Sequence, residues 1–169
     1  EIASGGSYVI RFQDTGFWLA KYAARKGYHK PTGTIALNYC NNLRIFRYAE
    51  TLLAYAELVG VEGVAEQKGI SAQQCLDMVR DRAFGDTNHR VAVNKQNIIN
   101  ENHYEFVGEG HRYYDVVRWG ITEVLNVDNV PGINSARTWK SHNKYVAIPQ
   151  GDIDATKGTE FELKQNEGY

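Results

Sequence analysis

The chain has 169 residues, of which 43% are hydrophobic, and its 19 basic and 20 acidic side chains leave a formal net charge of −1. This length suits one hydrophobic core, and we expect a single domain over residues 1–169. The balanced charge argues against a nucleic-acid partner, and no apolar run approaches the roughly 20 residues that span a membrane. Because the chain starts on Glu1 and not on Met, we expect it to be part of a longer protein.

Aromatic residues are dense in the irregular segment 16–29 near the N-terminus. Trp18, Tyr22 and Tyr28 could form a surface on which a sugar ring stacks. Aromatic rings serve core burial as readily as interfaces, so we favour the alternative, in which they anchor the segment to a helical core. Before them, residues 8–12 alternate weakly, as a short strand does.

A helix is predicted to follow an N-cap at Asn41 or Asn42 and to run to about residue 59. Arg47 and Glu50 are spaced to pair on its flank. Its apolar stripe comprises Leu43, Phe46, Ala49, Leu52, Leu53, Ala56 and Val59.

A second helix should begin at a capping box, with Ser71 as N-cap and Gln74 three residues on, and should stop before Gly85. Two such helices joined by a short connection form an αα-hairpin, the unit of tetratricopeptide-type repeats. Cys40 and Cys75 lack the spacing of a metal motif, and free thiols and a disulfide both remain open.

The stretch 101–120 carries most of the chain's candidate chemistry. The helix that Asn94 caps should break at Gly108 and Gly110, and a second short helix should end at Gly120. On that second helix His111, Asp115 and Arg118 are spaced to share one face.

Three carboxylates of this stretch, Glu101, Glu105 and Glu109, stack on one helix face at four-residue spacing. Carboxylates side by side cannot flank a sugar from opposite faces as a glycosidase requires. We therefore expect buried salt bridges between helices and no enzyme activity. The cations available to the carboxylates are Arg80, Arg82, Arg112 and Arg118.

No cofactor or metal is expected. His111 has Asp115 four residues on but no third ligand nearby, so we interpret it as a hydrogen-bonded structural residue. The Asp152-x-Asp154 pattern lacks the glycine and the bidentate acid of a calcium loop, and we expect a turn there.

Residues 121–143 are polar and are predicted to form a long loop, followed by a short extended piece over 144–150. Trp139 lies in this loop without apolar neighbours in the sequence. It is either an anchor onto the core or an exposed platform on which a pyranose ring stacks.

Five blocks of the sequence, in the right order, resemble the SusD/RagB family. They are Arg47-Tyr48-Ala49-Glu50-Thr51-Leu52-Leu53, Val79-Arg80-Asp81-Arg82-Ala83, the Gly108–Asp115 string with Arg118-Trp119-Gly120, Ile148-Pro149-Gln150, and the Gln165–Tyr169 ending. Asn102, in place of an arginine, and Glu167, in place of a proline, depart from the pattern. The resemblance implies the C-terminal portion of a mostly α protein with tetratricopeptide-type hairpins, long irregular loops and a few short strands.

Ten residues would belong to the family's structural signature, and none of them to a ligand site. These are Glu50, Arg82, Glu101, Glu105, Glu109, His111, Arg112, Asp115, Arg118 and Trp119. Ligand contacts would instead come from Trp139, and then from Trp18, Tyr22 and Tyr28.

The function implied by the resemblance is glycan capture at the surface of the outer membrane. The whole protein would bind a starch- or polysaccharide-type oligosaccharide and deliver it to a SusC-like TonB-dependent transporter, held by an N-terminal lipid anchor outside this chain. Two alternatives remain open, namely a peptide-binding member of the family and a helical interaction module without a small ligand.

Overall fold

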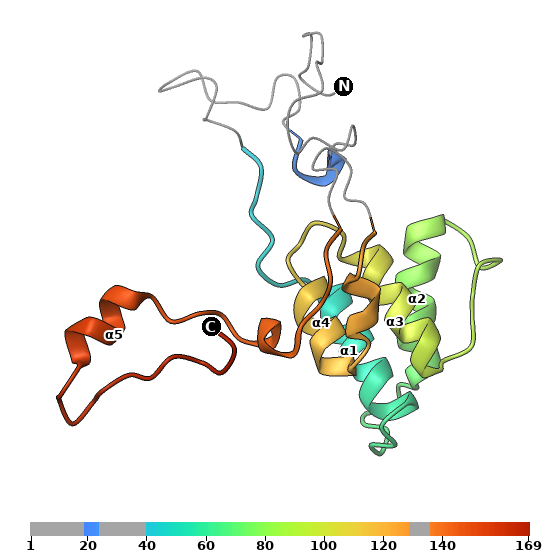
Figure 1. Ribbon diagram of the computed structural model, residues 1–169. Helices are drawn as coiled ribbons and strands as arrows, with labels where there is room; N and C mark the ends of the chain where they lie inside the picture. The colour runs from blue at the N-terminus through green and yellow to red at the C-terminus, as the bar shows by residue number, and fades with distance from the viewer. Residues whose placement is uncertain (1–18, 24–39, 129–135) are drawn as a thin grey trace, which may run out of the picture. The chain divides into compact units, whose positions relative to one another are not determined.

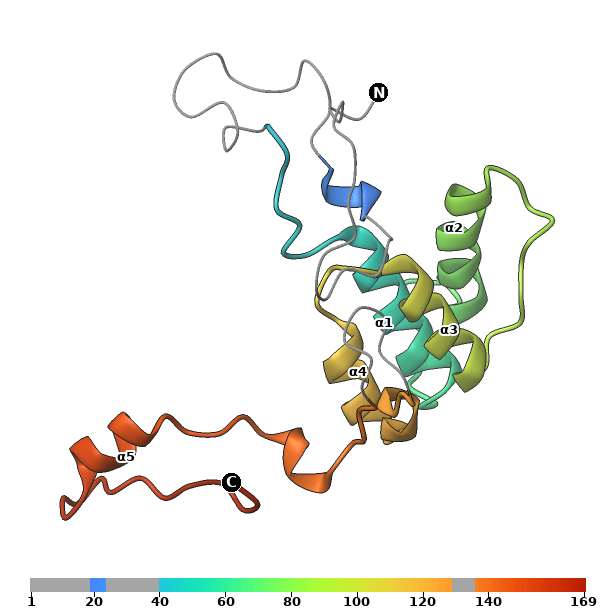
Figure 2. The same cartoon turned by 45° about the horizontal axis from the view of Figure 1, so that its top comes forward.

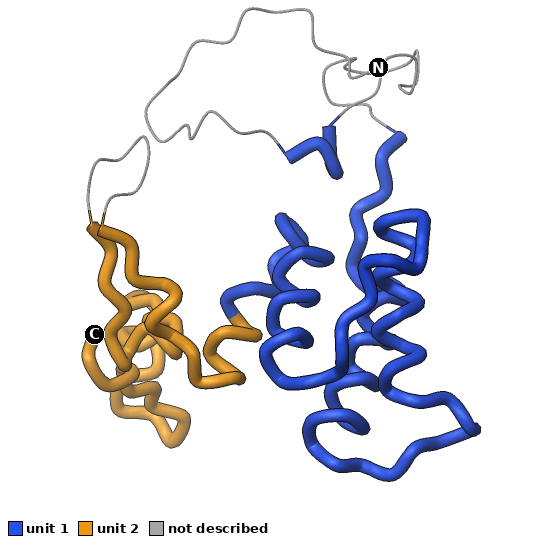
Figure 3. Tube along the Cα trace, turned by 90° about the vertical axis from the view of Figure 1, so that its right-hand side faces the viewer, with its two compact units in different colours: residues 1–7, 18–113 blue, residues 8–17, 114–169 orange. Residues whose placement is uncertain are grey.

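The structure is a computed structural model that describes residues 19–23, 40–128 and 136–169. These residues are mostly helical, as predicted, and within them the β pairing is one isolated antiparallel bridge between Val127 and Arg137. The predicted strand over 8–12 lies outside the described residues, and no other short strand is found within them. The chain divides into two compact units, with the boundary between Tyr113 and Tyr114 (Figure 3).

Helix α1 (Tyr48–Gly60) begins about five residues later than predicted. The expected first members of its stripe, Leu43 and Phe46, are 78% and 65% exposed. Arg47 has an extended backbone (φ −135°, ψ 154°), and its guanidinium contacts the Glu105–Glu109 region in place of the expected Glu50. Because Arg47 is held extended in this way, the helix starts only after it.

Helix α2 (Ala72–Phe84) has the predicted boundaries. The capping box is confirmed: the Gln74 amide N–H donates to Ser71 Oγ at 3.1 Å, and the Ser71 N–H donates to Gln74 Oε1 at 2.8 Å. Gly85 ends the helix in the left-handed conformation at φ 76°. The connection from α1 is tied to Tyr55, whose hydroxyl accepts from the Gln67 N–H at 2.7 Å and donates to the Ile70 carbonyl at 2.9 Å.

Helix α3 (Lys95–Glu105) starts at the predicted N-cap, because Asn94 accepts a hydrogen bond from the Asn97 N–H at 2.9 Å. Helix α1 contacts both α2 and α3, and the three lie side by side in both views (Figures 1 and 2). Each fully buried aliphatic side chain contributes roughly 1.5–3 kcal/mol. The core of this unit is Ala49, Leu52, Leu53, Ala56, Cys75, Leu76, Val79, Ile98 and Phe106.

Helix α4 (Arg112–Trp119) follows the predicted break, where Gly108 and Gly110 both have positive φ. Beyond it lie the 3₁₀ helices η2 (Thr122–Leu125) and η3 (Ser141–Lys144) and the short helix α5 (Gln150–Thr156). No helix in the described part of the chain is long and apolar enough to cross a bilayer.

The turn expected at residues 151–154 is instead part of α5. The Gln150 side-chain amide donates to Asp154 Oδ1 at 2.8 Å, one helical turn on, and the Thr156 hydroxyl donates to the Asp152 carbonyl at 2.9 Å. These local bonds favour a helical turn over the open turn predicted from the two aspartates.

The C-terminal residues bind back onto residues 145–148. The Gln165 side chain accepts from the Ile148 N–H and donates to the Ile148 carbonyl, both at 2.9 Å. The Tyr169 hydroxyl donates to the Tyr145 carbonyl at 2.8 Å. The Gln165–Tyr169 ending therefore has a structural role, because its side chains satisfy backbone groups that have no strand partner.

Both cysteines are free thiols, with Cys40 exposed and Cys75 buried in the core. Burial raises the pKa of the Cys75 thiol, which keeps it protonated and unreactive.

Candidate functional site

Arg47 is the centre of the ion-pair cluster that ties α1 to the end of α3. Its Nη1 lies 2.6 Å from Glu105 Oε1, and its Nε lies 2.8 Å from Glu109 Oε2. Its Nη2 also donates to Glu109 Oε1 at 2.9 Å and to the Glu105 carbonyl at 3.1 Å. A planar guanidinium suits this geometry, because it donates several hydrogen bonds in fixed directions.

Further cations complete the pairing of the three stacked carboxylates. Arg80 lies 2.5 Å from Glu101, and Arg82 lies 2.5 Å from Glu105. The three carboxylate side chains are only 2–9% exposed. Lys21 donates to Glu109 at 2.5 Å and to the Glu105 carbonyl at 2.8 Å, so the cluster also holds the segment 19–23.

Sequence reasoning did not identify Arg47 or Lys21 as partners of the carboxylates. Both lie more than fifty residues from them along the chain, where spacing rules have no reach. The spacing of Arg47 and Glu50 predicted a local pair, whereas Arg47 contacts Glu105 and Glu109 in the structure.

The pKa of Glu109 shows what this cluster does chemically. Burial would raise it, but the hydrogen bonds from Arg47 and Lys21 outweigh burial and hold the pKa of Glu109 below its ordinary value. A glycosidase acid needs the opposite shift, towards a proton retained at neutral pH. Glu109 is thus a fixed anion that stabilises the fold.

His111 lies just before α4, stacked on Phe106 with ring centroids 4.5 Å apart. Its Nδ1 is 4.0 Å from Glu50 Oε1, on α1. Within α4, Arg118 lies 3.2 Å from Asp115 and covers the Trp119 ring at 4.7 Å. Among the described residues, no three His, Cys, Asp or Glu side chains gather as a metal site would require.

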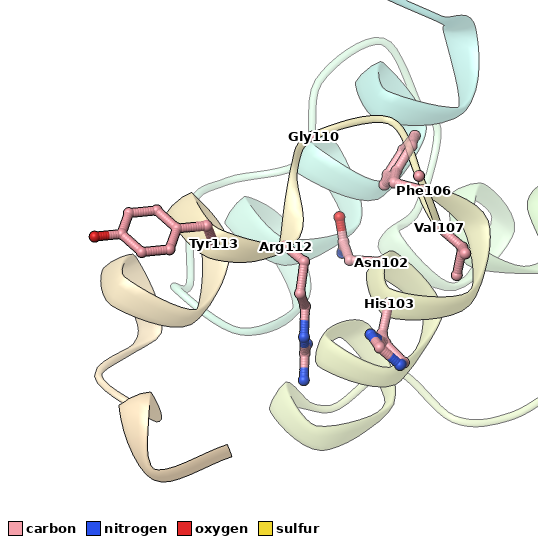
Figure 4. A pocket seen from close by; sticks show the side chains of 8 residues that line it. Asn102, His103, Phe106, Val107, Gly110, Arg112 and Tyr113 are labelled. Atoms are coloured by element: carbon pink, nitrogen blue, oxygen red, sulfur yellow. The ribbon is translucent and has the colours of Figure 1, made fainter. Parts of the chain in front are cut away.

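A pocket of about 340 Å³ lies between the end of α3 and the start of α4 (Figure 4). Arg112 and the titratable side chain of His103 both line it. Burial, together with the nearby charge of Arg112, lowers the pKa of His103 below its ordinary value. The remaining lining residues are Asn102, Phe106, Val107, Gly108, Gly110 and Tyr113. No sequence pattern indicates this pocket, because it forms only when the turn at Gly108 and Gly110 brings Arg112 and Tyr113 beside the end of α3.

The predicted ligand residues fall partly within the described ranges. Trp139 is partly buried, and its backbone N–H donates to Asn126 Oδ1 at 2.6 Å, next to the bridge that pairs Val127 with Arg137. Tyr22 is also partly buried, with the Arg44 guanidinium 5.4 Å from its ring centroid. Trp18 and Tyr28 lie outside the described residues.

Together, the helical hairpin and the ion-paired signature define a helical scaffold that carries long irregular segments. A profile of the SusD family matches residues 7–169, and the chain belongs to this family. The resemblance read from the sequence is thereby confirmed.

Three solved structures show the likeness in three dimensions. The surface glycan-binding protein A from Bacteroides fluxus is 54% identical, with a TM-score of 0.84 over 98% of this chain and 35% of its own. The surface glycan-binding protein A from Bacteroides thetaiotaomicron, solved with laminarihexaose, is 43% identical, with a TM-score of 0.78 over 95% of this chain and 32% of its own. A laminarin-binding SusD-like protein is 33% identical, with a TM-score of 0.71 over 96% of this chain and 31% of its own. The chain therefore spans about a third of the length of these relatives.

Proposed function

We propose that the protein to which this chain belongs binds an oligosaccharide at the cell surface. The observation that carries the proposal is the match over 98% of the chain, at 54% identity, to a surface glycan-binding protein. The ion pairs of the carboxylates and the lowered pKa of Glu109 support binding without hydrolysis, because the shift of Glu109 is opposite to the one that a glycosidase acid needs.

For the ligand we propose a laminarin-type glucan in place of the starch-type glycan expected from the resemblance alone. Two relatives support this choice, one solved with laminarihexaose and one described as laminarin-binding. We further propose a lipid anchor in the outer membrane and delivery of the glycan to a SusC-like TonB-dependent transporter. This part of the proposal rests on family membership.

Within the chain, we propose a division of labour between the helices and the irregular segments. The buried faces and ion pairs of α1, α2 and α3 are engaged in the fold. Loops on a rigid scaffold are the usual place for ligand contacts, and the ring of Trp139 is suited to stack on a pyranose. Trp139 is therefore the proposed contact in this part of the protein.

The test is a calorimetric titration of the whole protein with laminarihexaose and, separately, with maltohexaose of the same length. We expect laminarihexaose to bind and maltohexaose to bind at least about tenfold more weakly. Preference for maltohexaose would restore the starch-type assignment. Binding of neither sugar, together with binding of an unrelated peptide, would replace the proposal with peptide capture.

A further inference from the structure

Within the described part of the chain, one arginine of the stretch 101–120 has no acidic partner. Each of its acidic side chains has a cationic partner. Glu101 pairs with Arg80, Glu105 with Arg47 and Arg82, Glu109 with Arg47 and Lys21, and Asp115 with Arg118. Arg112 is left over: its Nη1 is buried and has no hydrogen-bond partner within the described ranges.

A buried guanidinium nitrogen without an acceptor is costly, since it has lost its water and gained nothing in return. Neighbouring carboxylates would normally satisfy it. Here, however, Glu105 and Glu109 are already engaged by Arg47, which makes hydrogen bonds of 2.6–2.9 Å to their side chains. The acceptor for Arg112 must therefore come from outside this cluster.

Arg112 borders the pocket between the end of α3 and the start of α4, which has space for an anion beside this residue. Figure 4 shows the Arg112 and His103 side chains reaching the same side of the pocket, one from each helix, whereas the Tyr113 ring points away from them. Among the residues that the structure describes, no carboxylate lines the pocket, so none of these lining side chains would repel an anion.

The pocket's size and remaining groups narrow the kind of anion. Its volume of about 340 Å³ is at the small end of ligand sites, which suits one sugar-sized molecule. The side-chain N–H of Asn102 donates to the Ile98 carbonyl at 2.9 Å, and its Oδ1 is an acceptor that a ligand hydroxyl could use. Phe106 and Val107 add apolar wall.

We propose that this pocket binds a sugar acid, with the carboxylate held by Arg112 and His103 beside it. The carboxylate accepts from the guanidinium of Arg112, because a planar guanidinium donates to a carboxylate in a fixed, forked geometry. Its negative charge also favours protonation of His103, which then becomes a second donor. This inference does not depend on the proposed capture of a neutral glucan.

The experiment uses the whole protein, sodium glucuronate as the probe, and glucose at matched ionic strength as the uncharged comparison. The His103 ring is followed by NMR during a pH titration. We expect glucuronate to shift the His103 signals and to raise the pKa of His103 by about 1, and glucose to do neither. This readout needs no substitution, so it stands even where a variant folds poorly.

Three variants locate the effect. Arg112→Met should weaken glucuronate binding at least about tenfold. Arg112→Lys keeps the positive charge but lacks the paired N–H donors of a guanidinium, and it should weaken binding less. The control is Arg90→Met, since Arg90 is exposed and pairs with Asp81 away from the pocket. It should leave glucuronate affinity unchanged.

Two results would overturn the proposal. The first is equal binding of glucuronate to Arg112→Met and to the unchanged protein. The second is no response of His103 to glucuronate, with Arg112→Met lowering the melting temperature. That pattern would mean that another part of the polypeptide supplies the acceptor.

Discussion

At the scale of single residues, Arg47 and Glu109 decide how the helices are joined. Glu109 is 2% exposed and accepts from both Arg47 and Lys21, so removing its carboxylate takes an anionic partner from each of these two partly buried cations. We predict that Glu109→Ala lowers the free energy of unfolding by about 3 kcal/mol. Chemical denaturation measures this directly, with Glu66→Ala, an exposed position, as the control. A loss no greater than that of the control would contradict the structural role of Glu109.

Glu109 should also make the free energy of unfolding depend on pH in the acidic range. The pKa of Glu109 is lowered in the folded protein and returns to its ordinary value of 4.5 on unfolding. The unfolded state therefore binds more protons, and the stabilisation is present above pH 4.5 and is lost as the pH falls through the folded-state pKa. We predict that Glu109→Gln makes the decline in unfolding free energy below pH 4.5 shallower. If the unfolding free energies of the unchanged protein and of Glu109→Gln fall equally steeply with pH over that range, Glu109 does not contribute.

At the scale of elements, the turn between α3 and α4 offers a matched pair of glycines. Gly108 and Gly110 both have positive φ, at 76° and 85°. A Cβ on Gly108 would come within 2.2 Å of the Leu19 side chain, whereas a Cβ on Gly110 would meet nothing within 4 Å. Both alanine variants should lose about 1–2 kcal/mol from backbone strain, and Gly108→Ala should lose more because it also displaces Leu19. Equal losses in thermal unfolding would show that the contact with Leu19 adds nothing.

The elements also show how far local patterns can be trusted. The boundaries of α2, the capping box at Ser71 and the N-cap at Asn94 were predictable, since each depends on residues within one helical turn. The start of α1 was not, because a tertiary contact of Arg47 overrides a continuous apolar stripe. The pocket beside Arg112 could not be predicted for the same reason, as it depends on the path of the chain through the glycine turn.

At the scale of the whole molecule, we propose that a charged helical scaffold provides stability and that an irregular, ring-bearing segment contacts the glycan. The ion pairs of Arg47 and Arg80 join elements far apart in the sequence, and they keep the helices in register. Trp139 is partly buried near the bridge between Val127 and Arg137, and its backbone N–H is bonded to Asn126, so the proposed stacking ring is carried on a fixed stretch of backbone. Stability and glycan affinity should therefore respond to different substitutions.

The most direct test of this separation is a laminarihexaose titration, paired with a melting curve, of the whole protein carrying Glu109→Gln or Trp139→Ala. Phe161→Ala, at an exposed ring in the same unit as Trp139, is the control. We predict that Glu109→Gln lowers the melting temperature with unchanged affinity. Trp139→Ala should weaken binding several-fold, about the loss of one stacked ring, with an unchanged melting temperature. Lost affinity in Glu109→Gln at an unchanged melting temperature, with normal affinity in Trp139→Ala, would contradict the account.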